Sequence, residues 1–383
     1  MTFNGSAIRA LLDRAVSSGA VHGIAATVVG RDGPLLYHAA GEATERSMFR
    51  NASMTKAVAT TAALQLIEQG LLGLDATVES ILPEFGKLQV LDGFDGDRPR
   101  LRPPASKATV RQLMTHSAGL GYYFLNEKLM RYHEVSGEPH VLSGLKRSLS
   151  APLVNDPGTA WEYGVNTDWL GLIIEKVSGQ TLGSYLGQRV YEPLGMKDST
   201  FAPRAEQRDR LLRVMQRRAD GKLAPSQLDL PPAPEWDSAG HGSYGTVQDY
   251  GRFVAAWLND GSGILKAATV QMAMQNQLGR IKLPEMIKSR VPELSNDVPS
   301  LQVPQTWGLG FHLMLADLPG MRSSGTGDWA GIFNSYYWID RSKGIGAVLM
   351  TQLLPFYDMR VIETLIAFEM AIYGQVGAAV PAA

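Results

Sequence analysis

Hydrophobic and polar positions alternate with a period of two in two regions near the ends of the chain. In residues 25–41, β-branched and small apolar residues alternate around Asp32-Gly33, a dipeptide typical of tight hairpins. Residues 336–340 and 345–351 show a similar pattern on either side of a turn at 341–344. The sequence therefore predicts an antiparallel hairpin near each end of the chain.

Elsewhere the apolar residues recur at helical spacing. This pattern predicts a first amphipathic helix within residues 1–19 and a closing amphipathic helix over 358–373. Further helices are predicted over residues 57–69, 110–115, 169–178 and 250–259. Proline pairs and clusters predict loops at 103–104, 231–234 and 284–304.

These elements predict an α+β fold, in which an antiparallel sheet flanked by helices carries an inserted helical domain. Residues 1–76 and 231–383 are expected to form the sheet domain, because both hairpins lie there. Residues 77–230 are expected to form the mainly helical domain. The cleft between the two domains is the expected position of a functional site.

Composition and charge limit the kinds of binding partner and of chemical site that the protein can have. The chain has 383 residues, of which 45% are hydrophobic and 19% are charged, enough for a large core. The formal net charge of -1 provides no basic field for a phosphate backbone, so neither nucleic acid nor an anionic membrane is expected as a partner. The absence of cysteine excludes disulfides, thiolate nucleophiles and zinc–thiolate sites.

The sequence shows neither a secretory signal nor a membrane span. Arg9, Asp13 and Arg14 interrupt the apolar stretch that a secretory signal requires. No later apolar run reaches the roughly 18 residues needed to cross a bilayer. The expected location is therefore the cytoplasm.

The main candidate for chemistry is Ser53-Met54-Thr55-Lys56, which matches S-x-x-K. One helical turn places residues three apart on the same face, so the amine can reach the hydroxyl and accept its proton. A second match at 143–146 lies among charged residues typical of a solvated helix face. Between Arg50 and Glu68, however, Lys56 is the only charged residue, which predicts a buried helix with Ser53 at its N-terminus. The alternative interpretation is a helix cap with an incidental lysine.

Two loops contain further candidate residues. Tyr163 lies in a turn-rich loop, residues 156–166, where it can carry a proton between nucleophile and leaving group, or simply pack beneath the loop. Small residues in the segment 325–332 allow close approach of backbone to a ligand, and an N–H there can pair with that of Ser53 as an oxyanion hole. A glycine-rich turn is the alternative for this segment.

These pieces, in this order, resemble the serine β-lactamase and penicillin-binding-protein superfamily, and most closely the family VIII carboxylesterases, whose sites look like those of class C β-lactamases. Further segments that match this superfamily lie at residues 113–120, 156–158, 170–175, 178–179 and 193–196. Residues 90–95, 116–119 and 123–125 look particularly like fungal acyltransferases of the lovastatin side-chain type. The resemblance covers nearly the whole chain.

The resemblance implies a role for each matching residue. Ser53 would be the acylated nucleophile, Lys56 its general base and Tyr163 the proton relay to the leaving group. The backbone N–H groups of Ser53 and Ile332 would form the oxyanion hole, and His116 would be structural. Neither a metal nor an organic cofactor is implied.

Two departures from the β-lactamase pattern bear on the substrate. The usual Lys-Thr-Gly is replaced by Trp329-Ala330-Gly331, which removes the cation that meets a substrate carboxylate. The asparagine usually found two residues after the tyrosine is one residue further, at Asn166, so its substrate contact is in doubt. Both changes favour a neutral or apolar acyl ester. The candidate substrate-binding residues are Tyr123, Phe124, Asn166, Trp329 and Gly331, with Tyr122 and Trp307 as further aromatic pocket liners, although ordinary core packing is the alternative for these aromatic side chains.

The expected function is thus a serine carboxylesterase or acyltransferase that acts on small-molecule esters. A β-lactamase or D-Ala-D-Ala peptidase is one alternative, and it predicts an export signal and a third-motif lysine. A non-catalytic binding member of the fold is another, and it predicts the loss of a catalytic residue. Ser53, Lys56 and Tyr163 are all present. The sequence does not determine the oligomeric state.

Overall fold

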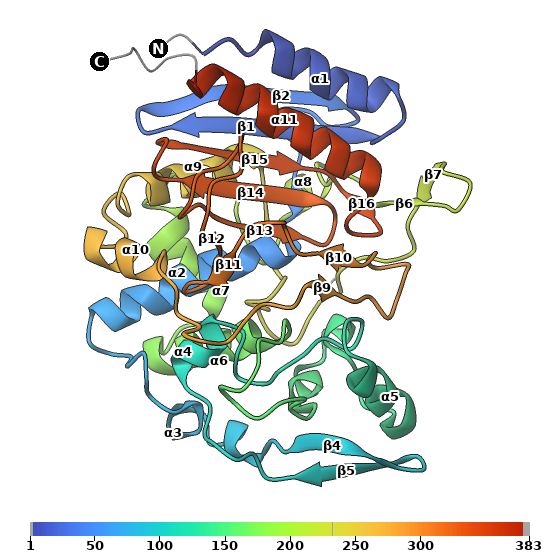
Figure 1. The fold of residues 1–383 in the computed structure, drawn as a ribbon, viewed down its shortest axis with the longest axis vertical. Helices are drawn as coiled ribbons and strands as arrows, with labels where there is room; N and C mark the ends of the chain where they lie inside the picture. Colours follow the sequence, from blue (N-terminus) through green and yellow to red (C-terminus); the bar gives the residue numbers. More distant parts are fainter. Residues whose placement is uncertain (1–2, 232, 378–383) are drawn as a thin grey trace.

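Seven antiparallel strands form the central sheet of the computed structural model, which describes residues 3–231 and 233–377. The strand order is β11-β12-β13-β14-β15-β1-β2, so strands from both ends of the chain meet in the middle of the sheet (Figure 1). From one edge to the other, the bounds are β11 Gln305–Trp307, β12 His312–Met314, β13 Gly327–Gly331, β14 Ser335–Asp340, β15 Ile345–Met350, β1 Gly23–Gly30 and β2 Gly33–Gly41.

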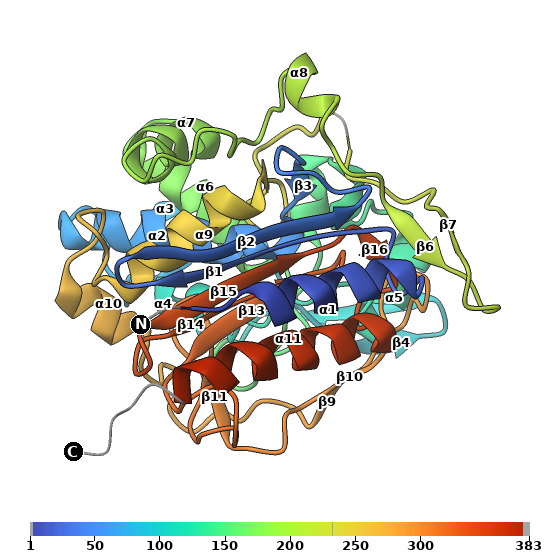
Figure 2. The same cartoon turned by 90° about the horizontal axis from the view of Figure 1, so that it is seen from above.

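The two terminal helices, α1 (Ser6–Ser17) and α11 (Met359–Gly377), cover one face of the sheet (Figure 2). In α1 the buried residues Ile8, Leu12 and Ala15 recur at helical spacing and form one apolar stripe. They pack in one cluster with alternate residues of the central strands, such as Ile24, Ala26 and Val28 of β1. This period of two shows which side chains of β1 point towards α1 and α11.

The opposite face of the sheet is covered by α9 (Val247–Leu258), and α2 (Thr55–Glu68) lies in the same core cluster. Ala25 and Val29, the intervening residues of β1, belong to this second core. Helix α2 is buried on all sides from Thr55 to Leu66, as expected for the helix that follows the S-x-x-K serine. Because both faces of the sheet are covered, every residue of β1 is buried.

The remaining elements lie mostly on the α2 side, and several of them form the helical part of the molecule (Figure 1). The helices are α3 Val78–Ile81, α4 Val110–Met114, α5 Glu127–Ser136, α6 Asn166–Ser178, α7 Leu182–Leu186, α8 Ala205–Arg208 and α10 Ala267–Ala273. The short strands are β3 Phe49–Arg50, β4 Val90–Asp95, β5 Arg98–Arg102, β6 Met215–Arg217, β7 Leu223–Pro225, β8 Tyr244–Gly245, β9 Met286–Ile287, β10 Val298–Pro299 and β16 Leu353–Leu354.

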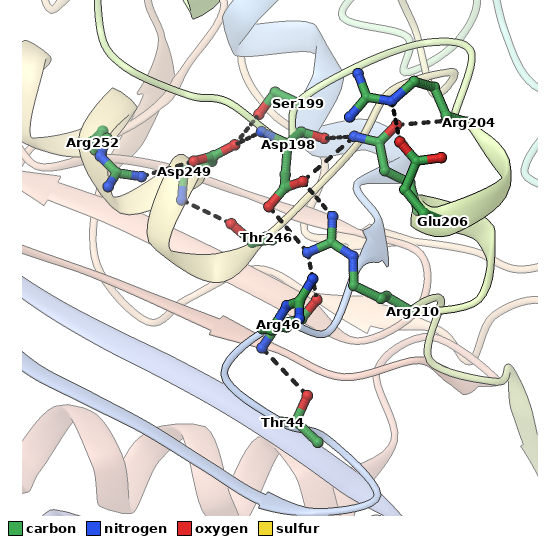
Figure 3. A network of polar contacts seen from close by, with 11 residues as sticks. Thr44, Arg46, Asp198, Ser199, Arg204, Glu206, Arg210, Thr246, Asp249 and Arg252 are labelled. Atoms are coloured by element: carbon green, nitrogen blue, oxygen red, sulfur yellow. Dashed lines mark hydrogen bonds and ion pairs between the residues drawn. The ribbon is translucent and has the colours of Figure 1, made fainter.

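A polar network joins the segment around α8 to α9 and to the loop after β2 (Figure 3). The backbone N–H of Asp198 and the hydroxyl of Ser199 both donate to Asp249 in the first turn of α9, at 2.8 and 3.1 Å. Arg210 pairs with Asp198, lowers the pKa of that carboxyl and also donates to the carbonyl of Arg46 at 3.1 Å. The network therefore fixes the chain on both sides of α8, next to the strand β8 that leads into α9.

The structure confirms the predicted hairpins as β1–β2 and β14–β15, and the predicted closing helix as α11. The predicted helices over 57–69, 110–115, 169–178 and 250–259 correspond to α2, α4, α6 and α9. Within residues 77–230 two hairpins accompany the helices, and one of them, β6–β7, pairs with β16 from the C-terminal part. The division into two domains stays a prediction, and Pro232 of the predicted loop 231–234 lies outside the described residues.

Candidate active site

Ser53 lies in a single turn of 3-10 helix, Ala52–Met54, that runs directly into α2. Its neighbours fix this turn from outside: the Tyr250 hydroxyl donates to the Met54 carbonyl at 2.9 Å, and Thr55 Oγ1 lies 2.8 Å from Ser243 Oγ. Ala52 has a positive φ of 45°, an unfavourable conformation for a residue with a Cβ. The chain therefore bends sharply before Ser53, which is half-buried at the start of a buried helix.

Lys56 is almost completely buried, and its amine makes three hydrogen bonds. Nζ lies 3.0 Å from Ser53 Oγ, 3.0 Å from the Tyr122 hydroxyl and 2.7 Å from the carbonyl oxygen of Gly240. The spacing of three residues within S-x-x-K thus brings amine and hydroxyl together, as the sequence indicated. A neutral amine in this position can accept the proton of the serine hydroxyl.

Tyr163 lies beside this pair, with its ring centroid 4.8 Å from Lys56 Nζ. Its hydroxyl oxygen accepts a hydrogen bond of 2.8 Å from Trp329 Nε1. The resemblance to β-lactamases places Trp329 at the position of the third-motif lysine. Because the indole N–H donates to the phenol oxygen, the phenol proton is free to be donated to another acceptor. The indole N–H also stabilises negative charge that develops on that oxygen.

Tyr122 is the tyrosine whose hydroxyl contacts Lys56, and sequence reasoning gave it no such role. Its ring lies 5.4 Å from that of Tyr163 and stacks on Phe124 at 5.0 Å. The two tyrosine loops approach closely because Gly164 packs on Gly121, where a Cβ would lie 2.4 Å from the Gly121 Cα. Burial raises the pKa of Tyr122 well above its usual value, and nearby Asp168 and Tyr163 raise it further, so the phenol stays protonated.

The end of β13 packs directly on the residues that precede Ser53. A Cβ on Gly331 would lie 2.6 Å from the carbonyl oxygen of Asn51, so this contact requires glycine. Ile332 follows immediately and lines the same cavity as Ser53. The two backbone N–H groups expected to form the oxyanion hole therefore belong to segments in direct contact.

The other expected substrate-binding residues divide into two groups. Phe124, Trp329 and Gly331 line the cavity next to Ser53. Asn166 and Tyr123 do not line it: Asn166 is fully buried, and its amide donates to the carbonyls of Leu120 and Glu162 at 2.9 and 3.1 Å. The expected contact of Asn166 with a substrate therefore does not match this geometry, because its N–H groups already hold the tyrosine loop in place.

His116 is also part of the packing around the tyrosines. It is buried, its ring lies 4.9 Å from that of Tyr163, and its Nδ1 lies 3.2 Å from the amide nitrogen of Asn166. Burial lowers the pKa of His116 well below its usual value, and the charge of Lys56 lowers it further. The imidazole is therefore neutral, in line with the structural role expected for it.

Ser53 opens into a cavity of about 350 Å³ whose lining is mainly apolar. Near Ser53 the walls are aromatic, with Trp161, Tyr163 and Trp307, and towards α11 they include Phe356 and Leu365. This volume and lining are typical of a pocket for a small apolar molecule.

Charged residues in the wall of this cavity are paired with one another. Asp328 accepts from Arg322 and from His312 Nδ1, the latter at 2.8 Å, and Arg322 Nε donates to Glu369 at 2.9 Å. The remaining nitrogen of His312 lies 2.7 Å from Gln305 Oε1. Because Arg322 faces two carboxylates, the group offers little excess positive charge to an anionic ligand.

Comparisons with known proteins show what this chain is similar to in sequence and in fold. A family model described as Beta-lactamase matches residues 8–369. The chain is 34% identical over 343 residues to the Monacolin J acid methylbutanoyltransferase of Aspergillus terreus (strain NIH 2624 / FGSC A1156). This match covers 85% of this chain and 82% of that protein. It is 31% identical over 364 residues to the lovastatin esterase of Penicillium rubens (strain ATCC 28089 / DSM 1075 / NRRL 1951 / Wisconsin 54-1255), with 87% and 90% covered. The solved structure of simvastatin synthase from Aspergillus terreus, in its LovD6 mutant, matches with a TM-score of 0.87 at 28% identity, over 97% of each chain.

Proposed function

The chain belongs to the beta-lactamase family, and we propose that it is a serine carboxylesterase or acyltransferase that forms an acyl-enzyme on Ser53, in the manner of family VIII carboxylesterases. The observation that carries this proposal is the 3.0 Å contact between Lys56 Nζ and Ser53 Oγ at the wall of an apolar cavity. The relatives named as a methylbutanoyltransferase and a lovastatin esterase support the reaction class.

In the first step, Lys56 accepts the hydroxyl proton of Ser53 while Oγ attacks the carbonyl carbon of the ester. The backbone N–H groups of Ser53 and Ile332 then stabilise the negative charge on the carbonyl oxygen. The contact of Gly331 with Asn51 supports this pairing, because it brings the two backbone segments together.

The tetrahedral intermediate collapses, the bond to the leaving alcohol breaks, and Tyr163 donates its hydroxyl proton to the departing oxygen. Lys56, which carries the proton from Ser53, then returns it to the phenolate oxygen of Tyr163, so that both side chains regain their starting protonation states. Tyr163 is the better candidate for this relay because it lines the cavity, whereas Tyr122 lies behind the lysine. Water or a second alcohol then attacks the acyl group and releases Ser53 by the same steps in reverse.

The proposed substrate is a small, neutral ester with an apolar acyl group. Its support is the apolar lining of the cavity, the paired charges of Arg322 and Asp328, and the place of Trp329 where β-lactamases have a lysine. The candidate substrate contacts are therefore Phe124, Trp329 and Gly331.

A cytoplasmic location belongs to the same proposal, and fractionation of cells that produce the protein tests it. Within residues 3–231 and 233–377, no helix combines the length and apolarity that a membrane crossing requires.

Steady-state assays test the function directly. We expect hydrolysis of p-nitrophenyl butyrate, little turnover of a chromogenic cephalosporin, and loss of ester hydrolysis in Ser53→Ala. Rapid cephalosporin turnover by the native chain would instead favour a β-lactamase. Unchanged ester hydrolysis in Ser53→Ala would remove the proposed nucleophile.

A further inference from the structure

A buried carboxylate lies behind the lysine of the candidate site. Asp168, in the first turn of α6, is fully buried, and its Oδ1 accepts hydrogen bonds from Ser238 Oγ at 2.5 Å and from the N–H of Gly240 at 3.1 Å. The carbonyl oxygen of the same glycine accepts the 2.7 Å hydrogen bond from Lys56 Nζ. A single residue, Gly240, therefore connects the carboxylate to the lysine.

The contact between Asp168 and this segment is close on both carboxylate oxygens. A Cβ on Gly240 would lie 2.3 Å from Asp168 Oδ2, so the carboxylate packs directly on the glycine backbone. Within the described part of the chain, Oδ2 has no hydrogen-bond partner, whereas Oδ1 has two. A buried carboxylate is costly unless it is hydrogen-bonded or faces an opposite charge, and the amine of Lys56 contacts the same glycine that the carboxylate contacts.

Lys56 is surrounded by titratable side chains from several elements. Tyr122 and Tyr163 approach it from the two loops described above, and His116 and His241 interact with it electrostatically. Burial lowers the pKa of both histidines, and the lysine charge lowers each further, although Asp168 raises that of His241 in part. Both imidazoles are thus neutral.

We propose that Asp168 is a positioning residue for Lys56: its carboxylate holds the Gly240 carbonyl against the amine and stabilises the ammonium that forms when the lysine takes the serine proton. This inference rests on the proposed role of Lys56 as base. In serine proteases a buried carboxylate orients the catalytic base and stabilises its protonated form. Asp168 would act in the same way, but through the backbone of Gly240.

Asp168→Asn separates charge from hydrogen bonding, because the asparagine keeps the Oδ1 that accepts both hydrogen bonds and replaces the unpartnered Oδ2 by NH₂. Loss of the negative charge makes Lys56 a weaker base. We expect the acidic limb of the kcat/KM profile for p-nitrophenyl butyrate to move down by about one pH unit. We also expect the plateau to fall roughly tenfold with little change in KM, since Asp168 does not line the cavity.

Ser238→Ala is the matched control, since it removes a hydrogen bond to Asp168 and keeps the charge. Its acidic limb should coincide with that of the native enzyme. If the limb of Asp168→Asn also coincides with the native one, or if Ser238→Ala moves it equally, the electrostatic role is wrong. Should Asp168→Asn fail to fold, the smaller Asp168→Ser removes the same charge and is judged by the same criterion. Ser53→Ala and Lys56→Ala, measured in parallel, show separately whether the proposed function itself holds.

Discussion

The hydroxyl of Tyr122 offers a sharp test of how the lysine is held. Tyr122→Phe removes the 3.0 Å hydrogen bond to Lys56 Nζ and keeps the ring that stacks on Phe124. A hydrogen bond to a charged group contributes about 1.5–3 kcal/mol, which corresponds to roughly a 10- to 150-fold fall in kcat if the bond positions the amine in the transition state. KM should change less than twofold, because Tyr122 does not line the cavity.

Tyr163→Phe is the comparison, because this tyrosine lines the cavity and is the proposed relay. Loss of a proton donor lowers kcat by roughly 10² to 10⁴. Stopped-flow acylation with p-nitrophenyl butyrate, combined with thermal melts of both variants, separates chemistry from stability. A native acylation rate in Tyr122→Phe, or a smaller loss in Tyr163→Phe than in Tyr122→Phe, would refute these assignments.

Three further variants test the donor to Tyr163, the oxyanion hole and the ion pairs of the cavity wall. Trp329→Phe keeps an aromatic ring but removes the N–H donor to Tyr163, so kcat for ester hydrolysis should fall about tenfold or more; an unchanged kcat would contradict it. Gly331→Ala places a Cβ 2.6 Å from the Asn51 carbonyl, so acylation of the enzyme should be nearly lost while the melting curve stays cooperative. Acylation is measured by mass spectrometry, and acylation at the native rate would exclude the proposed oxyanion hole. Burial alone would raise the pKa of Asp328, but its imidazole and guanidinium partners outweigh burial and lower it. Its contribution to stability is thus present above the ordinary carboxyl pKa of 3.8 and is lost as the pH falls below that value towards the folded-state pKa. Asp328→Asn should lower the free energy of unfolding by about 3 to 5 kcal/mol at pH 7 and by less near pH 3, measured by urea denaturation; an equal loss at both pH values would contradict this pairing.

The sequence predicted the parts of the fold that depend on local pattern. The Asp32-Gly33 dipeptide between alternating residues marked the β1–β2 hairpin, although the turn itself lies at Arg31-Asp32 and Gly33 begins β2. The uncharged run around Lys56 marked a buried helix. S-x-x-K predicted contact between Ser53 and Lys56 because a helical turn alone fixes that distance. These features involve residues within one hairpin or one turn.

Features that depend on contacts between distant segments were not predictable in the same way. Tyr122 and Tyr123 are adjacent aromatic residues, and the one whose hydroxyl contacts Lys56 is set by the approach of segments that lie 66 residues apart in the sequence. Asp168 had no signal in its own helix, because its partners lie 70 residues or more further along the chain. The paired charges of the cavity wall likewise depend on contacts between separate strands and α11.

Intact-mass spectrometry after brief mixing with p-nitrophenyl butyrate, followed by peptide mapping, is the most direct test of whether Ser53 carries the acyl group. We expect one butyryl adduct on the native chain, located at Ser53 and absent from Ser53→Ala. An adduct on a different residue, or one that persists in Ser53→Ala, would contradict it.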